Sequence, residues 1–422
     1  MSFPFFLRSL AGWCGPGAVT IAALLLPACN SHSDSSATQA TQTAGPPVLT
    51  SPAAPANSPG TWYRQYRGVL PGSSDSITVH LQCLPASPGE STLGRLAGFY
   101  SAADGHPYEL AGDTPAGTDS LNVREVSAEV LDADRNGASW LLRAQGNLLV
   151  GTRAGRPVQL RLVQPPRGVQ FVSRSFAANV KPRPDHPQDT IAGRISLHAL
   201  VPVSGPAKEV LADNLLRGLR GDTLDTQPVP ALEALWKEQL NSFTKDYQEE
   251  AGSMLTELEA DTSSYRPFAT LRYEDQASTY VLWNDGDLLS IGYFGYYYGG
   301  GAHGNYGTTV CSYDARTGRP LRSANIFRPG TEAQLEKLLG RYARPALGLK
   351  PNQPLSDALF ENTLPATSNV YLTSGGAVFV YAPYEVASYA QGEIRVFVPL
   401  SALRPLLQPK LPLSGGGEVV RK

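Results

Sequence analysis

The stretch "YFGYYYGGGAHGNYGTTVCSYDARTG", residues 293–318, decides how the second half of the chain folds. Its centre, GGGAHG at 299–304, satisfies the GxGxxG pattern of dinucleotide-binding proteins. That fingerprint requires a helix after the glycines, because the N–H groups of the helix terminus hold the phosphates. Here a β-like run follows instead. The stretch therefore predicts two strands, 287–297 and 307–314, joined by a tight loop whose glycines adopt positive φ.

Around this hairpin, residues 170–408 show mixed helical and extended patterns. Apolar residues at three- and four-residue spacings predict helices over 206–219 and 230–258, and a further helix opens at Thr331, with Gln334 completing a capping box. The other strands are predicted at 171–176, 190–203, 268–273, 278–284, 377–381 and 394–399. We expect an α+β unit with helices packed on a largely antiparallel sheet, divided into domains 170–300 and 301–408.

Residues 61–166 contain short strands separated by turns. Ile77, Val79, Leu81 and Cys83 alternate with polar residues, as in a half-buried strand, and turn signals such as Asn-Gly recur between similar runs. Seven or eight sequential strands predict an all-β antiparallel meander closed into a small barrel, resembling lipocalin-like or avidin-like barrels. A barrel of this size is either filled by side chains or admits one small molecule, and we expect the filled interior.

The first 28 residues have the layout of a secretory signal. An apolar run too short to span a bilayer leads into Leu-Pro-Ala-Cys, and a small residue directly before Cys29 is the bacterial lipobox pattern. Residues 1–28 are thus predicted to be a lipoprotein signal peptide, with Cys29 lipidated and 29–60 a disordered tether. The alternative is ordinary cleavage beside an incidental cysteine. Residues 409–422 are predicted to form a flexible tail.

Composition excludes several classes of function. A formal net charge of −2 without a basic stripe gives no electrostatic footprint for nucleic acid. No Cys/His cluster is present, so we expect no metal site and no cofactor. The run beginning at Asp132 resembles the start of a calcium loop, but Arg143 stands where that loop needs glutamate. Cys83 and Cys311 are expected to be buried free thiols, with a disulfide between them as the alternative.

Three segments together carry a family resemblance. "YYYGGGAHGNY" at 296–306, "YDARTGRPLRSANIF" at 313–327 and "VFVYAPYEVASYAQGEIRVFVPL" at 378–400 resemble the C-terminal domain of the RsiV-like family. The positions that match the motifs of that family after the glycine loop are Asp314, Thr317, Gly318, Asn325, Phe327, Pro383, Tyr384, Glu385, Tyr389 and Gly392. Residues 170–300 resemble the partner domain of PdaC/RsiV type that precedes it.

The resemblance implies a bacterial envelope protein. Such paired domains form the outer part of lysozyme-sensing anti-sigma factors and the non-catalytic portion of some peptidoglycan deacetylases. We recognise neither a cytoplasmic anti-sigma segment nor a deacetylase domain in this sequence. The resemblance therefore favours a cell-envelope lipoprotein, on the periplasmic or surface face of a membrane and held there by its lipid anchor alone. It would be a non-catalytic binding or sensing module for a peptidoglycan-type glycan or a lysozyme-like protein.

The candidate binding residues lie on both sides of the glycine loop and in the later tyrosine cluster. They are Tyr296, Tyr298, His303, Asn305, Tyr306, Tyr384, Glu385 and Tyr389. Tyrosines suit binding surfaces because they combine a large contact area with a polar tip. Strand alternation predicts Tyr296 and Tyr298 on one face and Tyr297 on the other.

Two alternatives to a binding module stay open. One is a cryptic glycan-active hydrolase in which His303 pairs with Glu385 or Asp314, although no hydrolase motif is present. The other is a purely structural envelope protein. Among the remaining histidines, His198 is predicted to lie on the solvated face of its strand, because it is opposite in phase to Ile195 and Leu197.

Overall fold

The computed structural model describes residues 60–85, 92–115, 120–131, 136–165, 167–221, 228–261 and 267–413. The predicted signal peptide, Cys29, nearly all of the predicted tether and residues 414–422 lie outside the described residues, as do the first four positions of the acidic Asp132 motif. No helix in the described ranges is long and apolar enough to cross a bilayer.

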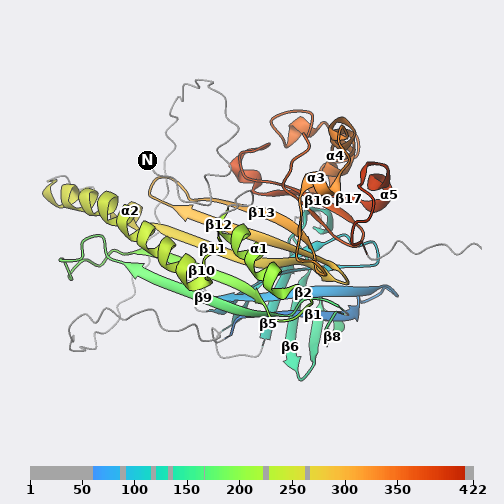
Figure 1. The fold of residues 1–422 in the computed structure, drawn as a ribbon, viewed down its shortest axis with the longest axis horizontal. Coiled ribbons are helices and arrows are strands. Elements are labelled where there is room, and N and C mark those ends of the chain that lie inside the picture. Colours follow the sequence, from blue (N-terminus) through green and yellow to red (C-terminus); the bar gives the residue numbers. More distant parts are fainter. Residues whose placement is uncertain are drawn as a thin grey trace, which may run out of the picture.

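The N-terminal strands close into a barrel, as the sequence predicts (Figure 1). Each strand pairs antiparallel with the next, and β1 pairs with β8 to complete the circle. The strands are β1 (Trp62–Val69), β2 (Ser76–Pro85), β3 (Thr92–Ser101), β4 (Tyr108–Pro115), β5 (Ser120–Glu125), β6 (Ser139–Gln145), β7 (Leu148–Arg153) and β8 (Arg156–Val163). A short 3-10 helix, η2 (Ala128–Val130), follows β5.

Apolar side chains fill the inside of the barrel. Trp140, Leu149 and Leu160 are almost entirely buried there, together with Ile77 and Leu81 of β2, in a single core cluster. Clustered side chains with so little exposure are what a filled protein interior contains. This cluster agrees with the expectation that side chains occupy the interior of the barrel.

The second layer is a six-stranded sheet in the order β14-β13-β12-β11-β10-β9. Its strands are β9 (Phe171–Val180), β10 (Gly193–Pro202), β11 (Glu274–Asp285), β12 (Leu288–Tyr298), β13 (Asn305–Asp314) and β14 (Pro320–Leu321). All neighbours run antiparallel except β10 and β11, which are parallel. A parallel pair needs a long crossover connection, and that connection holds α1 (Lys208–Arg220) and α2 (Leu232–Ala260).

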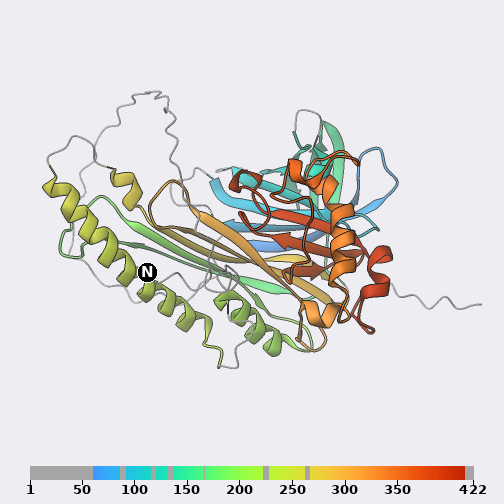
Figure 2. The ribbon, with the colours of Figure 1, turned by 90° about the horizontal axis from the view of Figure 1, so that it is seen from above.

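The two helices cover one face of this sheet, and the barrel and the C-terminal elements cover the other (Figure 2). On the helical face, Leu211, Leu215, Leu235 and Trp236 pack into the largest core cluster of the described chain. The hairpin predicted at 284–287 is confirmed as the β11–β12 turn, with Gly286 at φ 61°. β12 and β13 flank the predicted domain boundary at 300/301 and pair in the same sheet.

The third layer is a three-stranded antiparallel sheet with helices beside it. It contains β15 (Val370–Leu372), β16 (Gly376–Tyr381) and β17 (Ile394–Pro399), with α3 (Ser323–Ile326), α4 (Glu332–Ala346), α5 (Leu400–Leu403) and the 3-10 helices η4 (Leu355–Asp357), η5 (Tyr389–Gln391) and η6 (Arg404–Leu406) around it. Leu335 and Leu339 of α4 pack against the strands in one core cluster. Leu282 of β11 and Val310 of β13 pack against Val380 in another, which joins the two sheets. The predicted architecture, an all-β barrel followed by an α+β unit, is confirmed.

Two local predictions are wrong. Residues 268–273 form no strand: Phe268–Leu271 is a 3-10 turn, η3, in which the N–H and the hydroxyl of Thr270 both donate to the Pro267 carbonyl, at 3.0 and 2.7 Å. Side-chain bonds of this kind compete with strand pairing. The capping box at Thr331 is also absent, because its hydroxyl donates to the Arg328 carbonyl instead of accepting from the helix.

The prediction of a solvated His198 is wrong as well. Its exposed fraction is only 4%, because the barrel covers the face of β10 that the alternation assigned to water. His198 Nδ1 lies 2.7 Å from the Ser175 hydroxyl, and Gln82 of β2 lies 3.4 Å from its Nε2. The Gln82 amide also donates to the Thr279 carbonyl of β11 at 2.9 Å. Cys83 and Cys311 are both buried and free, as expected.

Candidate functional site

Two segments far apart in the sequence meet beside the glycine loop. His303 comes from the connection between β12 and β13, and Tyr384 and Tyr389 come from the connection between β16 and β17. The His303 ring lies 4.1 Å from the Tyr389 ring and 6.2 Å from the Tyr384 ring, centroid to centroid, stacked in both cases. Together with Tyr296 and Tyr306 on the adjoining strands, these residues are called the aromatic site below.

Hydrogen bonds to one carbonyl fix the orientation of the rings. The Gly304 oxygen accepts from His303 Nδ1 at 2.9 Å and from the Tyr389 hydroxyl at 2.6 Å. A carbonyl can only accept, so Nδ1 carries the proton and Nε2 is left as an acceptor. The Tyr384 hydroxyl lies 3.3 Å from Nε2 and donates to it. Both ring nitrogens of His303 are thereby used in holding the site together.

Gly304 is required by the packing at the base of the aromatic site. A Cβ at this position would lie 2.6 Å from atoms of the Tyr296 ring, closer than real Cβ contacts come. Tyr296 pairs across the hairpin with Tyr306, whose ring meets Tyr389 edge to face at 5.9 Å. Edge-to-face pairs of this kind stabilise by about 0.5–1.5 kcal/mol beyond the area that they bury.

Tyr384 projects from the aromatic site into solvent. Its exposed fraction is 54%, and its backbone adopts φ 68°, in the left-handed region. A residue with a side chain pays about 1–2 kcal/mol for that conformation. The turn around it is closed by the Glu385 N–H, which donates to the Ala382 carbonyl at 3.0 Å, and by the Ala382 N–H, which donates to the Glu385 carboxylate at 2.9 Å.

The structure brings five of the eight sequence-predicted binding residues together, and these are the members of the aromatic site. The hydroxyl of Tyr298 donates to the Gly301 carbonyl at 3.1 Å and so braces the loop itself. Asn305 is exposed at the first position of β13, and Glu385 is occupied in the turn. Tyr297 lies on the opposite face of the sheet from Tyr296 and lines a cavity beneath α2, as the alternation predicts.

The acid–base pair required by the hydrolase alternative is not formed within the described residues. His303 contacts Gly304 and Tyr384, whereas Glu385 binds the backbone of its own turn. Asp314 forms an ion pair with Arg316 at 3.0 Å. General acid–base catalysis needs its partners within hydrogen-bonding reach. In this arrangement the histidine orients aromatic rings.

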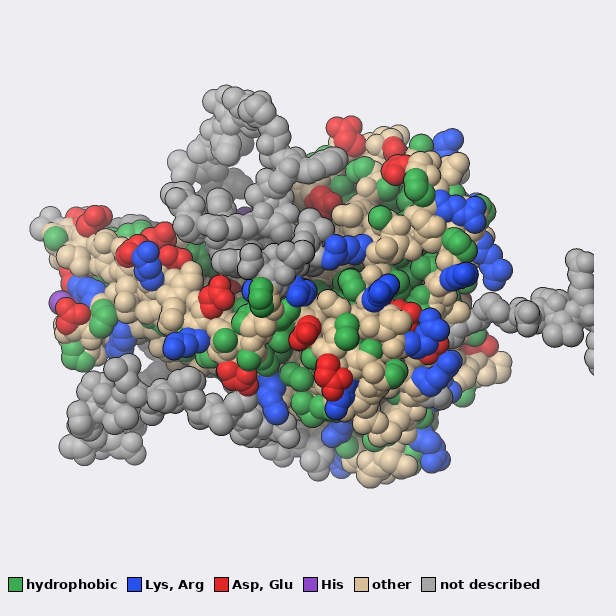
Figure 3. Space-filling view, viewed as in Figure 1, with side chains coloured by type: hydrophobic (Ala, Val, Ile, Leu, Met, Phe, Trp, Pro, Cys, Tyr) green, Lys and Arg blue, Asp and Glu red, His purple; other side chains and the backbone are tan. Residues whose placement is uncertain are grey.

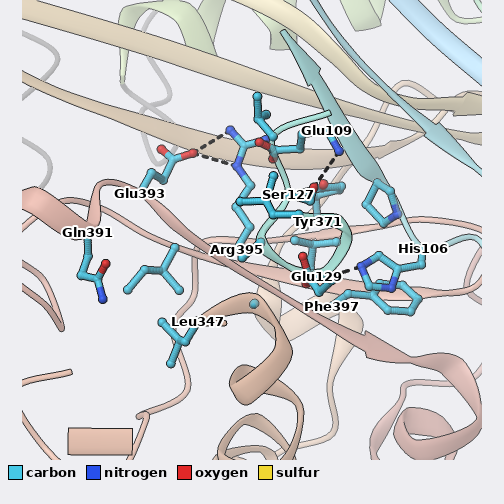
Figure 4. A pocket seen from close by; sticks show the side chains of 17 residues that line it. His106, Glu109, Ser127, Glu129, Leu347, Tyr371, Gln391, Glu393, Arg395 and Phe397 are labelled. Carbon is cyan, nitrogen blue, oxygen red and sulfur yellow. Dashed lines mark hydrogen bonds and ion pairs between the residues drawn. The ribbon is translucent and has the colours of Figure 1, made fainter. Parts of the chain in front are cut away.

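A second feature is a polar cavity of about 200 Å³ between the barrel and the C-terminal sheet (Figure 4). Arg395 of β17 lies at its centre. Its guanidinium forms ion pairs with Glu393, at 2.6 Å, and with Glu109 of β4, and it donates to the Tyr280 hydroxyl at 3.2 Å. At the other end, His106 stacks on Phe397 with ring centroids 4.4 Å apart.

The charges in this cavity serve mainly to join the two units. Burial acts to lower the pKa of Arg395, but the charges of Glu109 and Glu393 outweigh it and raise that pKa well above its ordinary value. Burial lowers the pKa of His106. One carboxylate oxygen of Glu393 is buried without a hydrogen-bond partner among the described residues. Breaking a buried ion pair by removing one partner costs several kcal/mol, so this network fixes the barrel against the sheet.

Sequence reasoning missed both interfaces of the barrel. His80 and Gln82 of the barrel are buried against the six-stranded sheet, and His198 of that sheet is buried against the barrel. No pattern within a single strand shows such a contact between two units. A signal was nevertheless present, since β2 carries polar residues on its outer face that are bulky and uncharged.

On the face of the molecule seen in Figure 3, acidic and basic side chains of the described residues are interspersed.

Comparison with known proteins identifies one domain. Residues 324–401 match the family described as "Protein of unknown function (DUF3298)", so the C-terminal part of the chain contains a DUF3298 domain. A structure of a DUF3298 family member from Bacteroides fragilis NCTC 9343 is 22% identical with a TM-score of 0.49, and a DUF3298 family protein from Pseudomonas aeruginosa PAO1 is 20% identical with a TM-score of 0.39. Each match covers 57% of this chain and 95% of the other. No curated protein matches.

Proposed function

We propose that this chain is a lipid-anchored envelope protein whose aromatic site binds a peptidoglycan-type glycan or a lysozyme-like protein without transforming it. The observation that carries the proposal is the aromatic cluster in which the His303 ring stacks on exposed Tyr384 and on half-buried Tyr389, assembled from two distant segments. Exposed aromatic rings held in fixed positions are the side chains that contribute most at binding surfaces. The same rings offer flat faces for the apolar faces of sugars.

The conformation of Tyr384 supports a role in binding. Backbone strain concentrates at functional sites, where the surrounding structure enforces it. Tyr384 combines a left-handed backbone with high exposure, so its own burial does not offset the strain. A purely structural module would gain stability by placing glycine or asparagine at this position.

Anchoring rests on the sequence. The lipobox-like Leu-Pro-Ala-Cys segment and the Ser/Thr/Ala/Pro-rich stretch after Cys29 favour acylation and a tether that holds the folded part away from the bilayer. The resemblance to the RsiV-like family agrees with an envelope location. Mass spectrometry of the membrane fraction, compared with a Cys29→Ser variant, tests the anchor, and an unacylated chain in the cytosol would refute it.

A binding assay tests the site. Detergent-solubilised full-length protein is incubated with insoluble peptidoglycan in one arm and with immobilised lysozyme in the other. We expect retention in one arm and a loss of about tenfold or more in Tyr384→Ala, consistent with a hot-spot side chain. Leu141→Ala is the matched control, because Leu141 is 56% exposed but lies on the barrel strand β6.

Three results would count against the proposal. They are absence of retention in both arms, equal losses in Tyr384→Ala and Leu141→Ala, and release of soluble glycan fragments by the wild type but not by His303→Ala. The third result would favour the hydrolase alternative. A His303→Ala variant that still binds fully would assign the histidine a purely structural role.

A further inference from the structure

A second cavity lies on the opposite side of the sheet, between α2 and the strands β11 and β12. Its volume is about 180 Å³, below the range of about 300–1,000 Å³ that is typical of drug-sized ligands. Asp275 of β11 pairs directly with Tyr297 of β12, and both side chains line the cavity. The cavity therefore has a defined floor, formed by paired residues of two strands.

Aromatic rings form much of its wall. Phe243 and Tyr247 of α2 are stacked with centroids 5.8 Å apart, and Tyr247 meets Tyr273 edge to face at 5.3 Å. The Tyr247 hydroxyl donates to the Leu271 carbonyl at 2.9 Å, which holds this ring in place. With Tyr297, four aromatic side chains line the cavity.

Negative charge surrounds these rings. The lining carboxylates are Glu238, Asp246, Glu250 and Asp275, against one cation, Arg220. Asp275 is partly buried, and among the residues that the structure describes none forms a hydrogen bond or an ion pair with its carboxylate. Burial raises the pKa of Asp275 to about 7, because a carboxylate withdrawn from water without a partner is costly to keep charged. Within the described residues no contact offsets this cost, whereas a cation bound in the cavity would.

We propose that this cavity is a binding site for a small organic cation, an alkylammonium compound held by Asp275 and by the surrounding aromatic rings. Cations bind over the faces of Tyr and Phe rings because the ring face carries partial negative charge. Carboxylates at the rim add attraction without demanding one fixed geometry. The small volume limits the ligand to few heavy atoms. This site is independent of the aromatic site and of any ligand bound there.

Choline is a suitable probe, and 3,3-dimethylbutan-1-ol, its neutral isostere, is the matched control ligand. Titration calorimetry on the full-length protein at pH 8 is expected to show saturable choline binding. The neutral compound should bind at least about fivefold more weakly, because it forms no cation–π contact with the rings and no ion pair with Asp275. Asp275→Asn keeps the shape of the side chain and removes its charge, so we expect at least about a fivefold weaker affinity for choline.

Two further variants separate the site from general effects of charge or folding. Tyr297→Leu removes a ring and should weaken choline binding more than binding of the neutral isostere. Glu257→Gln removes a carboxylate from the exposed side of α2, outside the cavity, and should leave binding unchanged. Equal affinity for the two ligands, unaltered choline binding by a folded Asp275→Asn variant, or no choline binding by the wild type would each overturn the proposal. Circular dichroism of each variant verifies that it is folded.

Discussion

The hydroxyl of Tyr389 lies 2.6 Å from the carbonyl oxygen of Gly304, although 85 positions separate the two residues. His303 Nδ1 donates to the same oxygen at 2.9 Å. One backbone carbonyl thus fixes a ring from each of two connections, one following β12 and the other following β16. A change on either side is therefore expected to alter the geometry of the other.

Tyr389→Phe is the most conservative test of this link. The substitution keeps the ring and removes only the hydroxyl, so unfolding in urea should show a loss of about 1 kcal/mol, typical of one hydrogen bond. Ligand retention by the aromatic site should fall as well, because the His303 ring loses a fixed neighbour. Tyr342→Phe on α4 is the control and should change neither property. Equal stability of the two variants would show that the bond to Gly304 contributes nothing.

Gly304→Ala tests the packing beneath the rings. The added Cβ would lie 2.6 Å from the Tyr296 ring, so the ring or the loop has to move, and we expect a loss of about 1–3 kcal/mol in the free energy of unfolding. Gly340→Ala offers the opposite expectation. Gly340 lies within α4 with open space around its Cα, so alanine should stabilise by about 0.5–1 kcal/mol. Thermal melting of both variants checks the contrast, and equal shifts would contradict it.

The fold could be predicted where one pattern governs one strand or helix. The barrel meander, the long helix α2 and the hairpin at Gly286 all follow from local periodicity and turn chemistry. His198 could not be placed, because its exposure depends on the barrel strand β2, whose Gln82 lies 116 positions earlier in the chain. The 3-10 turn at 268–271 was missed because a single proline and a threonine hydroxyl overrode an extended-looking run.

The candidate site was predictable in composition but not in geometry. The tyrosines and His303 stood out in the sequence as unusual, and five of them come together in space. Two other candidates have different roles, since Tyr298 braces the loop and Glu385 closes a turn. These roles depend on hydrogen bonds with the backbone, which residue types do not reveal. The cavity beneath α2 gave no signal, since Asp275 and Tyr297 become neighbours only through the register of β11 and β12.

The buried histidines predict how stability depends on pH. Burial lowers the pKa of His198 to about 4 and that of His80 to about 3. Between about pH 6.5 and pH 4 the unfolded chain binds protons at these positions and the folded chain does not. Stability should therefore fall as the pH is lowered through this window, by about 1.4 kcal/mol per pH unit for each histidine.

His198→Asn isolates one of these contributions. Urea unfolding at pH 6.5, 5.5 and 4.5 should show a pH dependence that is shallower by about 1.4 kcal/mol per unit than in the wild type. The absolute stability will also fall, because the new side chain fills less space, so the slope is the quantity to compare. Equal slopes in the variant and the wild type would show that His198 is not buried in neutral form.

Asp275→Asn should stabilise the protein, unlike most substitutions at a half-buried position. Burial raises the folded-state pKa of Asp275 to about 7, against about 3.9 in an unfolded chain. A raised carboxyl pKa means that stability present below pH 4 is lost as the pH rises through about 7, so the charged side chain opposes folding at pH 8. We expect the variant to gain roughly 1–3 kcal/mol at pH 8 and less at pH 5, measured by urea unfolding with Glu257→Gln as the control. Choline should narrow the gap at pH 8, because a ligand that binds only the folded wild type raises its stability by mass action. A variant less stable than the wild type at pH 8 would mean that the Asp275 carboxylate has a partner within the fold, and the cation site would then lose its physical basis.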